Sequence, residues 1–364
     1  MNLMEICELI VDCPHSTAKD EKYGYPLVRT PNIGKGRLLL DNVYRVSEEV
    51  YNERNKRAIP QKNDLILARE APVGNVAIIK EGQNVCLGQR TVLIRPNKEK
   101  VNPDYLVYYL LSPGVQCRFL NASNGATVSH LNMSDIRNLE IEVPDISIQN
   151  KIGKFLSLID DKISDNYKIN KNLEQQAQAI YSRMFIEHRQ ESWSTGQLSD
   201  LISVKYGKDH KRLADGNYPV YGSGGIMRYV EKPLYTGESV LIPRKGTLNN
   251  VMYVSEAFWS VDTMFYTEML HPNIAKFVYH FVKSKDLASL NAGSAVPSMT
   301  TNILNAMQLY IPDEKTLEKF ENIVSPMYSA MQENTKESKI LANTRDTLLP
   351  KLMSGELDVS DIDL

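Results

Sequence analysis

The sequence predicts an α+β protein with two globular domains in a pseudo-two-fold arrangement, joined by two long antiparallel coiled-coil helices. Three observations predict this architecture: one unit occurs twice in the 364 residues, each copy begins with short strand-like runs, and each copy leads into a long helix. The predicted boundaries follow the repeat: first domain 1–146, first helix 147–190, second domain 191–312, second helix 313–355 and an acidic tail 356–364.

The repeat rests on five pairs of short segments that occur in the same order in both halves of the chain. They are residues 65–69 with 240–244, Asn75-Val76 with Asn250-Val251, 102–111 with 271–280, 125–132 with 293–300, and Pro144-Asp145 with Pro312-Asp313. A single short apolar match arises easily by chance, but five matches in one order do not. The chain therefore contains two copies of one unit.

Within each copy the residue types predict strands first and a helix afterwards. In the first copy, aliphatic runs bounded by Gly, Pro and Asn predict strands over residues 64–69, 75–79 and 91–95. A Tyr- and Leu-rich segment then predicts a helix over 103–111, and its counterpart in the second copy spans 272–282. Strands and helices without strict alternation indicate α+β domains.

The long helices are predicted from seam residues that alternate at spacings of four and three, as at the a and d positions of a coiled coil. The seam of the first helix runs from Ile152 to Met184, and that of the second from Phe320 to Leu352. Both seams are interrupted at the same place by polar residues: Asn166 and Asn170 in the first, Asn334 and Ser338 in the second. We expect these four side chains to form a polar layer that fixes the register of the pair.

The seam alone permits either a parallel or an antiparallel pairing, because both bring the polar layers together. Connectivity favours the antiparallel one, because the second helix can return to the first domain only by running in the opposite direction. Asn166 then faces Ser338, and Asn170 faces Asn334. About 40 helical residues make a rod on the order of 60 Å. The alternative, two amphipathic helices each packed on its own domain, stays open, although the matched polar layers disfavour it.

Composition indicates a globular protein, with 42% hydrophobic and 24% charged residues. The net charge of −2 neither supports nor excludes a nucleic-acid partner, because acidic helices can balance a basic face. The four cysteines, Cys7, Cys13, Cys86 and Cys117, form no Cys-x-x-Cys pair, so we expect free thiols in a reducing cytoplasm and no zinc ribbon. We expect no membrane partner, because the sequence has no secretion signal and no stretch of about 18 apolar residues.

Motifs for catalysis do not occur in the sequence. Gly222-Ser-Gly-Gly225 lacks the Lys-Ser/Thr of a phosphate-binding loop and predicts a tight turn. The acidic residues of Pro312-Asp-Glu-Lys315 stand at a helix start, where carboxylates cap the helix, and not on adjacent strands that converge on a metal. The sequence has no His-x-x-x-His pair, no nucleophile elbow and no Asn/Asp-Pro-Pro-Tyr methyltransferase motif. We therefore expect no catalytic, cofactor-binding or metal-binding residue in this chain.

Several segments resemble the specificity subunits of type I restriction-modification systems. The run Thr344–Leu357 is similar to the family's closing signature, and residues 68–75, 125–132 with 135–139, 218–225 and 258–265 recur in the family's order. The resemblance covers nearly the whole chain. One loop departs from the pattern, because Leu248-Asn249-Asn250 follows Thr247 where family members usually carry a glycine. The resemblance therefore does not imply the backbone conformation of that loop.

This resemblance implies a non-catalytic DNA-recognition subunit. Its domains would be two target-recognition domains, each reading one half of a gapped double-stranded DNA sequence, with the helices as the spacer. Two methyltransferase subunits, and restriction subunits where present, would bind to it. S-adenosylmethionine, ATP and Mg²⁺ would bind to those partners and not to this chain. Half-sites about one helical turn apart present their major grooves on one face of the duplex, which suits a rigid spacer.

For DNA contact the sequence offers Arg, Lys, Asn, Ser and Tyr in turn-rich loops, which are residue types that bind bases or phosphates. In the first domain the candidates are Arg29, Asn32, Lys35, Arg37, Arg69, Asn75 and Arg90. In the second domain they are Lys205, Lys208, Lys211, Arg212, Tyr221, Ser223, Arg228, Arg244 and Lys245. Arg69 and Arg244 occupy equivalent positions in the repeat, so a salt bridge within each domain explains them nearly as well as base reading does.

Two other classes of function stay open on the sequence. One is a self-contained DNA methyltransferase or nuclease of unfamiliar design, which turnover by the purified chain alone would reveal. The other is a structural adaptor whose domains bind protein, which salt-sensitive binding to one gapped DNA sequence would exclude.

Overall fold

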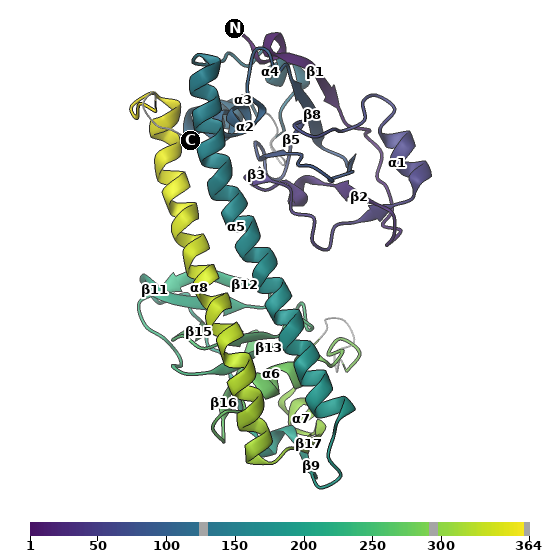
Figure 1. Ribbon diagram of the computed structural model, residues 1–364, viewed down its shortest axis with the longest axis vertical. Helices are drawn as coiled ribbons and strands as arrows, with labels where there is room; N and C mark the ends of the chain where they lie inside the picture. Colours follow the sequence, from purple (N-terminus) through teal and green to yellow (C-terminus); the bar gives the residue numbers. More distant parts are fainter. Residues whose placement is uncertain (124–129, 291–297, 360–364) are drawn as a thin grey trace. The chain divides into compact units, whose positions relative to one another are not determined.

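The computed structural model describes residues 1–123, 130–290 and 298–359, and the chain forms two compact units (Figure 1). Unit 1 is Met1–Tyr167 together with Asn334–Leu364, and unit 2 is Lys168–Glu333. The two long helices, α5 (Ile146–Tyr181) and α8 (Glu314–Met353), both run through the two units. Parts of the repeat segments 125–132 and 293–300, and the last residues of the acidic tail, lie outside the described residues. The predicted domain boundaries stay a prediction.

The strands of unit 1 are β1 (Cys7–Asp12), β2 (Tyr25–Val28), β3 (Gly36–Arg37), β4 (Arg45–Val46), β5 (Leu65–Ala68), β6 (Val76–Ile78), β7 (Cys86–Leu87) and β8 (Thr91–Pro96). They form a sheet in the order β1-β8-β5-β6-β3 and a smaller sheet β4-β2-β7. The short helices are α1 (Glu48–Arg54), α2 (Pro103–Leu111), α3 (Pro113–Ala122) and α4 (Met133–Arg137). Unit 1 also contains the first part of α5 and the last part of α8.

The strands and the helix predicted for the first copy are confirmed. β5 pairs antiparallel with both β6 and β8, so the three predicted strands are neighbours. Alternate residues of β5 enter two apolar clusters, Leu65 and Leu67 in one and Ile66 in the other, which explains why the strand is apolar throughout. Helix α2 starts at Pro103, and the Asn102 side chain caps it by accepting from the Tyr105 amide at 2.9 Å.

The strands of unit 2 are β9 (Ser194–Gln197), β10 (Ile202–Tyr206), β11 (Asp215–Gly222), β12 (Gly225–Val230), β13 (Ser239–Pro243), β14 (Met252–Val254), β15 (Trp259–Ser260), β16 (Met264–Met269) and β17 (Gln308–Ile311). They form three sheets, with the orders β10-β16-β13-β14, β12-β11-β15 and β17-β9. Helices α6 (Ala275–Lys283) and α7 (Thr301–Asn305) complete the unit, with the remaining parts of α5 and α8.

Helix α6 begins three residues later than the predicted 272–282. Asn273 has φ +59°, a left-handed conformation that a right-handed helix does not accommodate. At the start of α8, the Asp313 carboxylate accepts from the Thr316 amide at 2.9 Å. The acidic residues after Pro312 therefore include a helix cap, as the sequence predicts. Helix α5 ends at Tyr181, where a π-helical segment, Ser182–Glu187, follows.

Helices α5 and α8 pair antiparallel within each unit, which confirms the predicted direction. In unit 1 the Arg345 guanidinium lies 2.5 Å from the Asp160 carboxylate, and farther along α5 the Asn166 amide donates to Ser338 Oγ at 3.3 Å. In unit 2 the Asn170 amide donates to the Met331 carbonyl at 3.0 Å, and farther along α5 the Tyr181 ring centre lies 6.2 Å from that of Phe320. Residue numbers therefore rise along one helix as they fall along the other.

Asn166 is 1% exposed and is the central polar group of the helix pair in unit 1. Its amide donates to Glu337 Oε2 at 2.7 Å as well as to Ser338 Oγ. Ser338 is the partner that the seam pattern assigns to it. Because an unpaired buried amide is costly, this bonding disfavours any shift of register between the two helices.

Candidate nucleic-acid interface

A β-hairpin of unit 2 carries the glycine-rich segment 222–225. Strands β11 and β12 pair up to the Gly222–Gly225 contact, so Ser223 and Gly224 form the turn. Gly225 has φ +110°, a conformation that side chains rarely adopt. The tight turn predicted here is confirmed, and its backbone geometry accounts for the glycine at position 225.

The loop after β10, residues 207–212, carries a dense run of cations. Its start is fixed by two hydrogen bonds: the Lys208 amide donates to the Ser260 carbonyl, and Trp259 Nε1 donates to the Lys208 carbonyl, both at 2.8 Å. A Cβ on Gly207 would lie 2.0 Å from the Val261 carbonyl oxygen, so only glycine permits this close approach. The loop is therefore held in place by the strand segment beside it.

A third loop, residues 244–250, is bonded to the hairpin turn. The Asn250 side chain donates to the Ser223 carbonyl at 2.7 Å. A Cβ on Gly246 would lie 2.8 Å from Ser223 Oγ, so the two loops touch. The amides of Arg244 and Lys245 both donate to the Thr263 carbonyl, at 2.9 and 3.2 Å. We call residues 207–212, 222–225 and 244–250 the three-loop surface.

Four cations of this surface are exposed: Lys208, Lys211, Arg212 and Lys245. Among the residues that the structure describes, no carboxylate lies at ion-pair distance from any of them. An exposed cation without an internal partner keeps its full charge available to an incoming anion. The three-loop surface therefore presents positive charge on a backbone that is already fixed.

Other candidates of unit 2 have partners within the unit. Lys205 lies 3.5 Å from the Glu268 carboxylate, and Arg228 lies 2.7 Å from that of Asp215. The Tyr221 hydroxyl donates to Glu256 Oε1 at 3.0 Å, and burial together with this carboxylate raises its pKa well above the ordinary value. Tyr221 is therefore a neutral hydroxyl over the whole physiological pH range. The Arg244 guanidinium lies 5.4 Å from the centre of the Tyr206 ring.

Replacing Asn250 with alanine is expected to release the hairpin turn. The loss of this half-buried hydrogen bond lowers the free energy of unfolding by about 1 kcal/mol. The added cost of ordering the loop weakens DNA binding roughly tenfold. Urea unfolding and a fluorescence-anisotropy titration with duplex DNA measure the two effects. Asn217→Ala, an exposed amide on β11, is the matched control and should change neither. Equal losses in both variants would contradict the anchoring role.

The corresponding residue of unit 1, Asn75, has an equivalent role. Its side chain donates to the Ile33 carbonyl at 2.9 Å, so it anchors the loop after β2 just as Asn250 anchors the hairpin turn. The repeat aligns these two asparagines, but the sequence predicts Asn75 as a DNA contact. In the structure the Asn75 side-chain amide already donates to a carbonyl inside unit 1. A DNA contact by Asn75 would have to use the same side-chain amide.

The equivalent arginines Arg69 and Arg244 differ in their partners. Arg69 Nη1 lies 2.8 Å from both carboxylate oxygens of Asp12, and its Nε donates to the Leu131 carbonyl at 2.8 Å. Both side chains of this pair are largely buried, at 14% and 17% exposure. On the sequence, a salt bridge within the domain is the alternative to base reading, and such a salt bridge is present at Arg69. Arg244 instead donates to the Asp262 carbonyl at 3.2 Å.

Three of the four predicted contacts in residues 29–37 have partners inside unit 1, and their role in DNA contact stays a prediction. Arg37 donates to the Ser157 carbonyl at 3.1 Å and to Asp161 Oδ1 at 2.6 Å, so its guanidinium faces α5. Arg29 stacks on Tyr44, with 3.4 Å between the guanidinium carbon and the ring centre. Asn32 is buried, and its side chain donates to the Leu39 carbonyl. Lys35 remains exposed.

Arg90 of unit 1 lies next to Gln89, which is bonded to the polar segment of His15 and Thr17. Its Nε lies 2.9 Å from Glu70 Oε2. The neighbouring Gln89 donates to the His15 carbonyl at 2.7 Å and accepts from Thr17 Oγ1 at 3.2 Å. His15, Thr17 and Gln89 are not among the DNA contacts predicted from the sequence. The signal available was the polar, turn-rich composition of residues 14–24.

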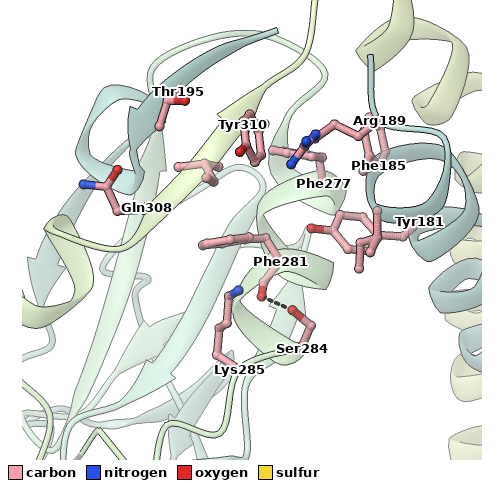
Figure 2. Close-up of a pocket in the computed structure, with 12 residues that line it drawn as sticks. Tyr181, Phe185, Arg189, Thr195, Phe277, Phe281, Ser284, Lys285, Gln308 and Tyr310 are labelled. Carbon is pink, nitrogen blue, oxygen red and sulfur yellow. Dashed lines mark hydrogen bonds between the residues drawn. The ribbon is translucent and has the colours of Figure 1, made fainter. Parts of the chain in front are cut away.

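Unit 2 also contains a cavity of about 450 Å³ beside the end of α5 (Figure 2). Aromatic side chains of α5, α6 and β17 line it, including Tyr181, Phe277 and Tyr310. The Arg189 guanidinium lies 4.1 Å from the centre of the Tyr310 ring, so this arginine covers one face of the tyrosine. None of the predicted DNA contacts lines the cavity.

Two further features bear on the kind of site. Among residues 1–123, 130–290 and 298–359, no three His, Cys, Asp or Glu side chains are placed to hold a metal ion. No helix in the described part of the chain has the length and apolar character needed to cross a membrane.

Comparison with known proteins was made at the level of family, sequence and structure. The family model described as the type I restriction modification DNA specificity domain matches residues 1–175 and 190–341. The chain is 25% identical over 370 residues to the MjaIX type I restriction enzyme specificity subunit of Methanocaldococcus jannaschii, covering 87% of this chain and 82% of the relative. It is also 25% identical over 269 residues to a putative type I specificity subunit of Mycoplasma pneumoniae, covering 67% and 71%.

A solved structure shares the fold. The crystal structure of the type I restriction-modification S subunit from M. genitalium matches with a TM-score of 0.59 at 19% identity. The match covers 97% of this chain and 95% of that chain.

Proposed function

The chain belongs to the type I restriction-modification DNA specificity family, and we propose that each of its units reads one half of a gapped double-stranded DNA target. It is a DNA sequence-specificity subunit of a type I restriction-modification system. The observation that carries the finer proposal is the three-loop surface of unit 2. Its four exposed cations have no carboxylate partner among the described residues, and its backbone is fixed before DNA arrives.

In this proposal the cations and the polar side chains have different tasks. Lys208, Lys211, Arg212 and Lys245 bind phosphates, which sets the position of the unit on the duplex. Ser223 and Arg244 stand between those cations and present groups that can reach base edges. Because Asn250 and Trp259 hold the loops in place, less conformational entropy is lost on binding.

Unit 1 reads the other half-site with a different set of groups. Arg90 and Lys35 are its exposed cations among the predicted contacts, and His15 and Thr17 lie in the segment bonded to Gln89 beside Arg90. Arg69 supports this region through its salt bridge to Asp12. Different side chains at equivalent positions give the two units different sequence preferences, so the target is asymmetric.

The partners follow from the same proposal. Methyltransferase subunits bind the paired helices, and restriction subunits join them where the system has them. The chain itself is non-catalytic and acts in the cytoplasm, and S-adenosylmethionine, ATP and Mg²⁺ bind to the partner subunits. The absence of methyltransferase and nuclease motifs from the sequence supports this division of labour.

The test uses the subunit assembled with its methyltransferase subunits. Methylation-sensitive sequencing of host DNA gives the target, and anisotropy titrations then compare that duplex with duplexes in which either half-site is scrambled. We expect each scrambled half-site to weaken binding by at least 100-fold, and log Kobs to fall linearly with log salt. Sequence-independent binding would overturn the proposal. Methylation or cleavage by the purified chain alone would overturn its non-catalytic part.

Matched insertion of seven residues into α5 and α8 is expected to lengthen the gap between the half-sites. Seven residues preserve the a/d seam, and each helix grows by about 10 Å, or roughly three base pairs. An insertion into one helix alone breaks the pairing, and we expect this variant to lose assembly. Target sequencing of methylated DNA measures the gap. An unchanged gap in the double-insertion variant would refute the role of the helices as spacer.

A further inference from the structure

Strand β12 exposes two large apolar side chains next to each other. Ile226 is 42% exposed and Met227 is 60% exposed. In its three-stranded sheet β12 pairs with β11 and forms the edge in the described part of the chain. Proteins usually protect exposed edge strands with charge, because an apolar edge invites aggregation. An apolar pair at such a place therefore calls for a functional explanation.

A β-bulge places Met227 over the end of the neighbouring strand β11. Tyr221 pairs with Ile226 and Val220 with Arg228, so Met227 is the extra residue on β12. Bulges re-aim a side chain and bend the strand that carries them. A Cβ on Gly222 would lie 2.5 Å from Met227 Sδ, which shows that the methionine passes over the glycine at the end of β11. Gly222 thus leaves room for Met227 beside the hairpin turn.

The hairpin that carries this apolar pair is bonded to loops that carry cations, and the Glu256 carboxylate also accepts from the Tyr221 hydroxyl on β11. The hairpin turn is bonded to the loop that carries Arg244 and Lys245 through Asn250 and Ser223. The Val261 amide donates to the Tyr221 carbonyl at 3.1 Å, and the same segment holds the loop of Lys208. An apolar tip beside cation-bearing loops is complementary to a polyanion with an apolar interior. Stacked bases between two phosphate backbones have this character, whereas a protein partner would require an acidic rim.

We propose that Met227, supported by Ile226, is a wedge that enters between two stacked base pairs of the half-site read by unit 2. The insertion unstacks that step and bends the duplex toward the three-loop surface, which adds phosphate contacts. Pyrimidine–purine steps unstack most easily, so the wedge favours a TA or CA/TG step at its position without touching a base edge. This inference rests on the proposed function, because it requires that unit 2 binds duplex DNA.

The test follows base unstacking directly. The assembled complex is mixed with target duplexes that carry 2-aminopurine at successive positions of the half-site, since the fluorescence of this base rises when it is unstacked. We expect a rise of several-fold at one step with the unmodified chain. Met227→Ala should return that signal to near the level of free duplex and weaken target binding about tenfold. Met227→Leu should retain both, because leucine is also a large apolar side chain.

Charge and folding are controlled separately. Because Met227 is neutral, Met227→Ala should leave the slope of log Kobs against log salt unchanged. Leu270→Ala, which removes an apolar side chain of unit 2 that is 53% exposed and lies outside β12, should leave both the signal and the affinity unchanged. Tryptophan fluorescence confirms that unit 2 remains folded in each variant, since Trp193 and Trp259 both lie in it.

Three outcomes would overturn the wedge. The first is sequence-specific binding by the unmodified complex without any 2-aminopurine signal, which leaves the proposed function standing. The second is Met227→Ala failing to assemble with the methyltransferase subunits while its own DNA binding is intact, which makes the apolar pair a protein-docking surface. The third is a complex that does not bind duplex DNA specifically at all, and this result also removes the proposed function.

Discussion

A chain in which Lys208, Lys211, Arg212 and Lys245 are all replaced by alanine is expected to lose DNA affinity on the order of 100-fold at physiological salt. Each phosphate contact that is lost reduces the number of counterions released when the protein binds DNA. The slope of log Kobs against log salt therefore becomes shallower by about 0.9 per lost contact. The loss should be similar for target and scrambled duplexes, because phosphate contacts carry no sequence information. Anisotropy titrations of the assembled complex at several salt concentrations measure both quantities.

The control for this variant has the same change in net charge. Lys56, Lys98, Lys100 and Lys232 are exposed lysines outside the three-loop surface and outside α5 and α8, and their replacement also removes four positive charges. We expect a small change in affinity and an almost unaltered salt slope, because distant charges are screened beyond about 8 Å. If both variants lose affinity equally, the effect is one of overall charge, and the three-loop surface is not the binding site.

Removal of Arg345 is expected to destabilise unit 1 by roughly 3–5 kcal/mol, because it leaves the Asp160 carboxylate buried without its cation. Asp160 is 3% exposed, and its other oxygen accepts from the Tyr108 hydroxyl at 2.7 Å. In Arg345→Met the apolar stem remains, so the loss reports on the charge. We expect the urea midpoint followed by far-UV circular dichroism to fall. The tryptophan transition should hardly move, because both tryptophans lie in unit 2.

Two further variants show whether the buried charge is the cause. Asp160→Leu combined with Arg345→Met removes both charges of the buried pair and leaves only the half-exposed Asp346 carboxylate beside it, so it should recover much of the stability lost in Arg345→Met. Lys351→Ala removes a surface ion pair of the same unit, whose side chains are 46% and 63% exposed, and it should cost less than about 1 kcal/mol. A double variant no more stable than Arg345→Met would show that lost packing, and not the buried carboxylate, dominates.

Local and periodic features of the sequence were sufficient to predict most of the fold. Three strands of unit 1, β5, β6 and β8, followed from aliphatic runs between turn residues, and the two long helices followed from their seam. The repeat added the connectivity argument, which predicted the antiparallel pairing. Asn166 and Ser338 lie together as the seam requires. Glu337 was not anticipated as the nearest acceptor for Asn166, because it flanks the seam and reaches in with a long side chain.

The candidate site was harder to predict, because its partners lie far apart in the sequence. Arg37 and Asp161 are 124 positions apart, and Arg69 and Asp12 are 57 apart, so neither pairing leaves a local signal. An arginine in a glycine-rich loop has the same local sequence whether it faces solvent or a helix. The cations of the loop after β10 can be read from the sequence, but the anchors of this loop, Gly207 and Trp259, became evident only from their contacts.

The carboxy-terminal part of α8 belongs to unit 1, and this affects how the chain folds during synthesis on the ribosome. Leu349, Leu352 and Val359 belong to the same apolar cluster as Leu3 and Ile6, whereas unit 2 lies entirely within residues 168–333. The part of the protein that is translated first is therefore completed last. Until residues 334–359 emerge, the nascent amino-terminal part of unit 1 has an open apolar surface, which favours aggregation. A premature stop codon soon after residue 333 leaves unit 2 whole and unit 1 unclosed.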